Sequence, residues 1–367
     1  MIIDNKRVIW FTLLLNRFGF ASQSYLNQNY TLSIGKIDLP NKKQFLGNKE
    51  QCRYCRSYNK NINSVKQRLG NSEILPEQTR SFKKIAHALP TLIGNANIIS
   101  KDECDTCNER FNKLENQLVS FLGVNRTLNK IKGRTGIPKT KVNRHEFVDL
   151  SGQDLIIATY EKSELYEEKD NVITITSKKK YIPIEVHKCF VKMALSVLPL
   201  EKLRHFSKTI EWLLNDYPLD KGYHNQLYIY ETKWPVKNMF SFVSVDVYER
   251  KFDRIDIPYM FSRICFNNFA FQFPIPLSSM DIMVNNFDIP IAVKRETQFE
   301  ELLDNNELWM KILKETITRK RDLSNHLRIE EIDKQHFSSI KKSEIIERND
   351  LPENILKYLK DNNFDSE

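Results

Sequence analysis

Early in the chain, the order of apolar and polar residues predicts two short strands followed by a helix. Residues 82–89 form the first candidate strand, which Pro90 ends, and a turn around Gly94 leads to a returning strand at 97–99. From 104 to 121, apolar residues recur at helical spacing. The pattern therefore predicts a hairpin that runs into an amphipathic helix.

The remaining two thirds of the chain mix both kinds of pattern. Residues 155–160 and 172–176 alternate between apolar and polar positions on either side of a charged turn, which predicts a second hairpin. Helical spacing predicts helices at 183–198 and 200–214, and the aromatic-rich runs of 226–293 are typical of antiparallel strands. The fold class is therefore expected to be α+β.

Changes in composition suggest five parts. The last part is charged and helical in pattern, which is typical of solvent-facing or partner-binding helices. The expected parts are an N-terminal segment at 1–45, a zinc-containing domain at 46–125, a basic linker or arm at 126–150, an α+β accessory domain at 151–296 and a helical C-terminal region at 297–367.

Composition narrows the class of partner. The chain has 367 residues, 41% of them hydrophobic, and a net charge of +9, which favours an anionic partner, nucleic acid before membrane. No stretch approaches the roughly 20 apolar residues of a membrane span. The apolar run at 8–15 imitates a signal peptide, but Asn16 and Arg17 interrupt it. We therefore expect a cytoplasmic protein without membrane contact.

Four of the six cysteines form two Cys-x-x-Cys pairs. Two such pairs suit one tetrahedral zinc ion, because each pair supplies two ligands from a single turn. Cysteines in metal-type pairs also indicate a reducing compartment. Cys189 and Cys265 lie among apolar residues and are expected to be core residues. The predicted zinc ligands, the four-cysteine group, are Cys52, Cys55, Cys104 and Cys107.

The stretch between the Cys pairs resembles the HNH endonucleases. The matching features are His87-Ala88-Leu89-Pro90, Gly94 in the turn, Asn97 and the run from Cys104 to Asn108. The resemblance covers about a fifth of the chain and implies a ββα-metal nuclease motif with zinc knuckles, in which four cysteines hold a structural zinc. As a combination it is more specific than either Cys pair, which alone would indicate only a zinc ribbon.

The resemblance also implies roles for individual residues. His87 matches the general base that takes a proton from water, and imidazole suits that work near neutral pH. Asn97 matches the asparagine that steadies the histidine-bearing loop, with Asn95 as a close competitor. Asn108 stands where many members have a metal-binding histidine. The implied catalytic ion is Mg²⁺ or Mn²⁺.

One position departs from the family pattern. Many members carry a metal ligand directly before the general base, where this chain has Ala86. On the predicted helix, Asn108, Asn112 and Glu115 share one face and are candidate ligands for the catalytic ion. The missing ligand leaves open a second interpretation, in which the four-cysteine group belongs to a non-catalytic zinc module that binds nucleic acid or a partner protein.

A basic segment follows the predicted helix. It contains seven basic residues and no acidic one, which is typical of contact with the phosphate backbone of double-stranded DNA. The residues are Arg126, Lys130, Lys132, Arg134, Lys139, Lys141 and Arg144.

The C-terminal part carries no motif of its own. We expect it to recognise a target, a partner protein, a second copy or a signal, as in bacterial restriction or antiphage effectors, which the architecture resembles. His187, His205 and His224 have no evident partners in the sequence and are expected to be structural or surface residues.

Overall fold

The chain forms two compact units. The computed structural model describes residues 23–61, 78–142, 146–150, 152, 155–159, 163–170, 172–216, 218–236, 239–291, 311–312 and 314–338. Unit 1 comprises Met1–Val119 and Tyr181–Arg328, and unit 2 comprises Ser120–Lys180 and Ile329–Glu367. This division cuts across the expected one, because residues 151–180 of the expected accessory domain belong to unit 2. The α+β class is confirmed.

A six-stranded antiparallel sheet dominates unit 1. The described strand nearest the N-terminus, β1 (Tyr30–Ile37), pairs with β13 (Phe240–Arg250), which lies more than 200 residues later in the sequence. The antiparallel strands predicted within 226–293 are confirmed. In spatial order the sheet consists of β1, β13, β14 (Met260–Asn267), β15 (Phe269–Pro274), β12 (Tyr228–Lys233) and β16 (Ile317–Asp322).

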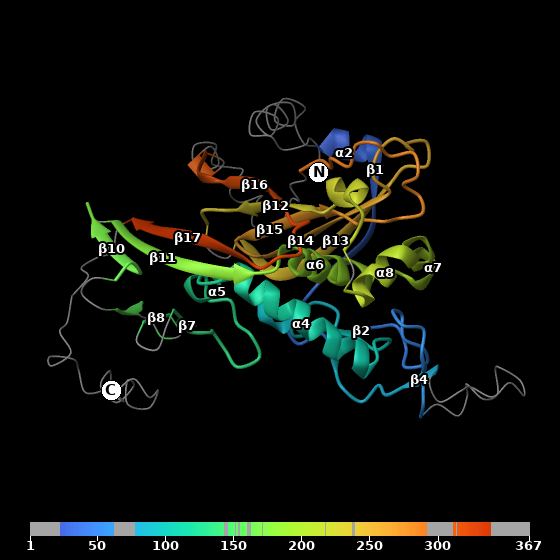
Figure 1. Cartoon of the computed structure of the whole chain (residues 1–367), viewed down its shortest axis with the longest axis horizontal. Coiled ribbons are helices and arrows are strands. Elements are labelled where there is room, and N and C mark those ends of the chain that lie inside the picture. Colours follow the sequence, from blue (N-terminus) through green and yellow to red (C-terminus); the bar gives the residue numbers. More distant parts are fainter. Residues whose placement is uncertain are drawn as a thin grey trace, which may run out of the picture. The chain divides into compact units, whose positions relative to one another are not determined.

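Helix α6 (Pro183–Val197) packs against this sheet (Figure 1). The Phe190 ring lies 4.8 Å from that of Phe271 and 5.7 Å from that of Phe273, so aromatic contacts fix the helix on the sheet. The predicted helix at 183–198 is confirmed. The one predicted at 200–214 is divided into α7 (Leu200–Leu203), η3 (Arg204–Phe206) and α8 (Ser207–Leu214).

The hairpin and helix predicted from residues 82–121 are present, although the first strand is shorter than the predicted 82–89 and the last residues of the helix belong to unit 2. Strand β5 (Ala86–His87) pairs antiparallel with β6 (Ile98–Ser100), and β6 pairs in parallel with β2 (Gln44–Leu46). Between β5 and β6 lies η2 (Thr91–Ile93), which Gly94 ends at a φ of 99°. Helix α4 follows at Asp105–Leu122. The smaller elements of this unit are α2 (Gln23–Asn29), β3 (Tyr58–Asn59), β4 (Thr79–Arg80) and η4 (Lys221–Gln226).

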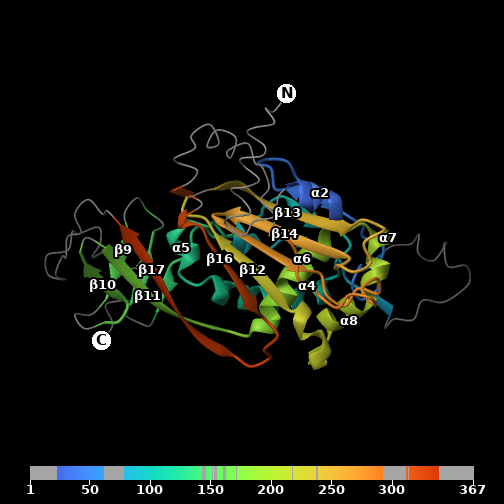
Figure 2. The same ribbon diagram turned by 90° about the horizontal axis from the view of Figure 1, so that it is seen from above.

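Unit 2 contains two three-stranded sheets and its own core. One sheet runs β10-β11-β17 (Figure 2) and the other β7-β8-β9. The buried residues Val124, Leu128, Val148, Leu165, Ile173 and Ile175 form the core. The elements are α5 (Asn125–Leu128), β7 (Thr140–Lys141), β8 (Phe147–Asp149), β9 (Ile156–Ala158), β10 (Tyr166–Lys169), β11 (Val172–Tyr181) and β17 (Ile329–Ser338).

Two sequence predictions in these regions are wrong. The strands expected to form one hairpin belong to different pairs, because β9 pairs with β8 and β11 pairs with β10. The C-terminal region was expected to be helical, and residues 311–312 and 314–315 are, but β16 and β17 are strands. Each adds an edge to a sheet, and this long-range pairing overrides the local charge pattern. Residues 297–310 and 339–367 lie outside the described ones. No helix in the described part of the chain is long and apolar enough to cross a membrane.

Candidate metal centre and hairpin site

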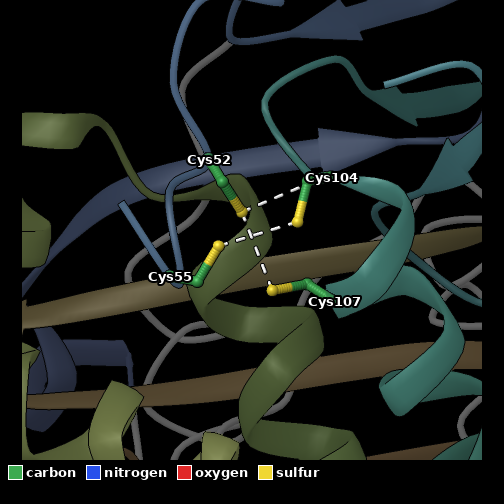
Figure 3. A group of neighbouring side chains, drawn as sticks. All are labelled: Cys52, Cys55, Cys104 and Cys107. Atoms are coloured by element: carbon green, nitrogen blue, oxygen red, sulfur yellow. Dashed lines mark hydrogen bonds between the residues drawn. The ribbon is translucent and has the colours of Figure 1, made fainter. Parts of the chain in front are cut away.

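The four paired cysteines converge on one point (Figure 3). Their Sγ atoms all lie within 4.8 Å of one another, with 3.8 Å between Cys52 and Cys107 and 3.6 Å between Cys55 and Cys104. These separations exclude disulfides, whose sulfurs are about 2.05 Å apart. A tetrahedron with Zn–S bonds of about 2.3 Å has edges of about 3.8 Å, so the group has the geometry to hold a metal such as zinc.

Arg53, inside the first Cys pair, ties the metal centre to the rest of unit 1. Its guanidinium forms a bidentate salt bridge with Asp102, at 2.9 and 2.8 Å, and both side chains are buried. Its Nη1 also donates to the carbonyls of Leu195 and Ser196, at 2.8 and 2.6 Å. These carbonyls lie in the last turn of α6, at the negative end of the helix dipole, and the Leu195 carbonyl also accepts from the Leu198 N–H at 3.3 Å.

Tyr54 reinforces the same attachment. Its hydroxyl lies 2.7 Å from the Ser196 hydroxyl, and its ring packs edge-on against Phe111 of α4 at 4.7 Å. The two residues between the cysteines of the first pair therefore bind α4 and α6 together, while the cysteines themselves face the metal position.

We expect Arg53→Met to destabilise unit 1 by about 3–5 kcal/mol, because it leaves the buried Asp102 carboxylate without its partner. Urea unfolding of the zinc-loaded protein measures the loss. A suitable control is Lys84→Met, since the Lys84–Glu109 ion pair is exposed and its removal should leave the urea midpoint unchanged. An unchanged midpoint for Arg53→Met would contradict the anchoring role.

His87 lies at the end of β5, paired across the hairpin with Ile99, and its side chain is half-buried. The buried residue beside it is Asn95, whose Nδ2 lies 3.5 Å from His87 Nδ1 and donates to the Leu89 carbonyl at 2.5 Å. Asn95 Oδ1 accepts from the backbone N–H of Ile98 at 3.1 Å. Asn95 therefore links both strands of the hairpin and the histidine ring.

Asn97 does not occupy the position that the family resemblance implied for it. Its Nδ2 donates to the Leu39 carbonyl at 3.0 Å, and its backbone N–H donates to the Asp38 carboxylate, so it faces the β1–β2 connection. The asparagine that steadies the His87 loop is thus Asn95, the competing candidate in the sequence. Asn95 and Asn97 are only two residues apart. Because the turn has no strand periodicity, the spacing in the sequence does not show which of them faces His87.

A buried ion pair lies behind the hairpin. Lys192 of α6 donates to the His87 carbonyl at 2.8 Å and lies 3.2 Å from Glu103 Oε2. Both charged side chains are at most 2% exposed. Burial raises the pKa of Glu103, and the Lys192 ammonium opposes that rise. The pair fixes the backbone of His87 against α6, a role that sequence analysis missed because Lys192 lies 105 residues away.

The predicted ligands of a catalytic ion differ in their exposure. Asn112 is exposed, Asn108 is half-buried, and Ala86 is fully buried in the packing of the hairpin. Burial raises the pKa of Glu115, and the positive charge of Lys192 opposes that rise. Among the described residues, the four-cysteine group is the only set of three or more His, Cys, Asp or Glu side chains arranged to hold a metal ion.

The basic segment divides into exposed and engaged residues, all in unit 2. Lys132 and Arg134 are exposed, as are Lys130, whose Nζ donates to the Gly152 carbonyl, and Lys141. Lys139 forms an ion pair with Asp149 at 3.6 Å. Arg126 was expected to contact the DNA backbone, but it is buried in α5, where burial lowers its pKa. Arg144 lies outside the described residues.

Of the residues expected to be structural or at the surface, Cys189, Cys265 and His187 are buried, whereas His205 and His224 are half-buried. Cys189 and Cys265 are at most 1% exposed, which confirms their assignment. His187 lies between the rings of Trp212 and Phe273, and burial lowers its pKa to about 3. Its imidazole is therefore neutral at physiological pH and takes no charge-dependent role.

No protein-family model, curated protein or solved structure matches this chain.

Proposed function

We propose that the hairpin and helix around His87 form the site of a metal-dependent, HNH-type endonuclease that hydrolyses phosphodiester bonds in DNA. The observation that supports it best is the order of the parts. A histidine ends the first strand of the hairpin, and a helix that begins between Cys104 and Cys107 follows the second strand. The same order underlies the family resemblance of the sequence.

In this proposal, His87 takes the proton from the attacking water. Asn95 holds the imidazole through the contact at Nδ1, and Lys192 holds the His87 carbonyl. Bound Mg²⁺ or Mn²⁺ would neutralise charge on the scissile phosphate. Asn108 and Glu115 of α4 are the candidates to hold it. The exposed residues Lys132, Arg134 and Lys141 would contact the DNA backbone without reading sequence.

The direct test incubates the purified, zinc-loaded protein with supercoiled plasmid and Mg²⁺ or Mn²⁺. We expect nicked and linear products that appear with either ion and disappear in EDTA. Intact plasmid under all conditions would contradict the proposal. An activity gated by a partner protein or by a signal, as in an antiphage or restriction effector, would instead require that component in the assay.

A second candidate is a non-catalytic zinc module that binds nucleic acid. It is favoured by one observation, that the described residues offer no second set of charged metal ligands besides the four-cysteine group. It predicts retention of DNA that weakens steeply with salt, without nicking. The plasmid experiment separates the two, because only the endonuclease changes the topology of the plasmid.

A further inference from the structure

A pocket of about 180 Å³ lies in unit 1 between α4, α6 and the end of α8. Pockets for drug-sized ligands measure about 300–1,000 Å³, so this one suits a small ion or a single head group. Its lining is unusually rich in ionisable side chains. They are Arg110, Lys113, Lys188 and His326, together with Glu185 and Asp216.

Lys188 is the buried cation of this pocket. The residue is 4% exposed, and its Nζ donates to the Asn215 carbonyl at 2.5 Å while lying over the Trp212 ring at 5.2 Å. An ammonium carries three N–H donors, and the described residues show one of them in use. Burial lowers the pKa of Lys188 to about 8, so its charged form gains from an anion beside it.

The other ionisable groups leave the pocket with a cationic surplus. Asp216 pairs with Arg110 at 2.7 Å, but its side chain is 93% exposed, so water screens the pair. Burial raises the pKa of Glu185, and the Lys188 ammonium opposes that rise, so the two carboxylates face three cations in Arg110, Lys113 and Lys188. The Nε2 atom of His326 is buried and has no hydrogen bond among the described residues. Lys113 is exposed at the rim and adds a further positive charge.

We propose that this pocket binds a small anion, the phosphate or carboxylate group of a free small molecule, through Lys188, Arg110 and Lys113. The buried ammonium supplies the specific contact, and the two residues of α4 supply charge at the entrance. The recognised chemistry is a compact oxyanion, which accepts hydrogen bonds from several donors at once.

The pocket shares two of its three helices, α4 and α6, with the candidate site. Lys188 and Lys192 are four residues apart on α6, one helical turn, and Lys192 bonds the His87 carbonyl. Arg110 belongs to α4, which also carries Cys107. A bound anion would therefore act on the two helices that position His87. This regulatory consequence rests on the proposed endonuclease function, whereas the binding itself does not.

Calorimetric titration of the zinc-loaded protein with inorganic phosphate, at constant ionic strength, tests the proposal. We expect saturable binding at one site, at least tenfold weaker in Lys188→Met and several-fold weaker in Lys113→Gln. The second variant changes an exposed side chain, so misfolding does not explain its effect. The matched control is Lys208→Met, an exposed lysine of α8 outside the pocket, which should bind phosphate like the wild type.

Three results would overturn the proposal. The first is the lack of saturable binding, and the second is binding that both pocket variants retain. The third is displacement of phosphate by a short DNA oligonucleotide, which would assign the pocket to the DNA backbone. The titration measures binding without cleavage, so a failure of the endonuclease proposal leaves this measurement intact.

Discussion

Replacing His87 with alanine is expected to reduce plasmid cleavage by about 10²–10⁴-fold, the usual contribution of a general base. The imidazole is half-buried, and Asn95 Nδ2 lies 3.5 Å from its Nδ1. Initial rates of nicking at saturating Mg²⁺ measure the effect, with zinc content and circular dichroism of the variant compared with the wild type.

The matched control is His224→Ala. His224 lies in η4 of the same unit and has no role in the proposed site. The His224→Ala variant should cleave DNA at the wild-type rate. This result would separate a specific effect of His87 from a general effect of losing a histidine. If His87→Ala cleaved plasmid like the wild type, the hairpin would not be the catalytic centre, and the non-catalytic zinc module would be the better interpretation.

Local signals in the sequence were sufficient for the metal centre and the elements around it. The Cys-x-x-Cys spacing fixes two ligands per turn whatever the rest of the fold does, and the four sulfurs do converge. Pro90 and Gly94 mark the turn between β5 and β6, and Gly123 ends α4 with a φ of 52°. Each of these features depends on neighbours within a few residues, which is why a single sequence predicts them.

Partners far apart in sequence were not predictable in the same way. The charged strands β16 and β17 acquire their conformation from sheets that other segments build. Asp102, which lies just before α4, forms its salt bridge with Arg53, 49 residues earlier in the chain. Likewise the sequence shows Glu103 and Lys192 as two ordinary surface charges, and only the packing of α6 against the hairpin buries them together.

Removal of zinc is expected to have the second large effect, this time on folding. The binding energy of a structural zinc is folding energy, about 10–16 kcal/mol in zinc-finger peptides at neutral pH. None of the four cysteines lies in the six-stranded sheet, so we expect that sheet to survive while the hairpin and the start of α4 lose their fixed positions. Limited proteolysis between residues 44 and 107, with and without a zinc chelator, measures this local unfolding.

Cys104→Ser should reproduce the effect of the chelator, with zinc content falling from one equivalent to near zero. Cys265→Ala is the matched control, because Cys265 is buried in β14 and lies outside the four-cysteine group. It should keep its zinc and its resistance to protease. Cys104 directly follows Glu103, which pairs with Lys192, and Lys192 in turn donates to the His87 carbonyl. Loss of zinc should therefore also abolish cleavage. Excess Mg²⁺ should not restore it. Full activity of a zinc-free protein would show that His87 is positioned without the metal centre.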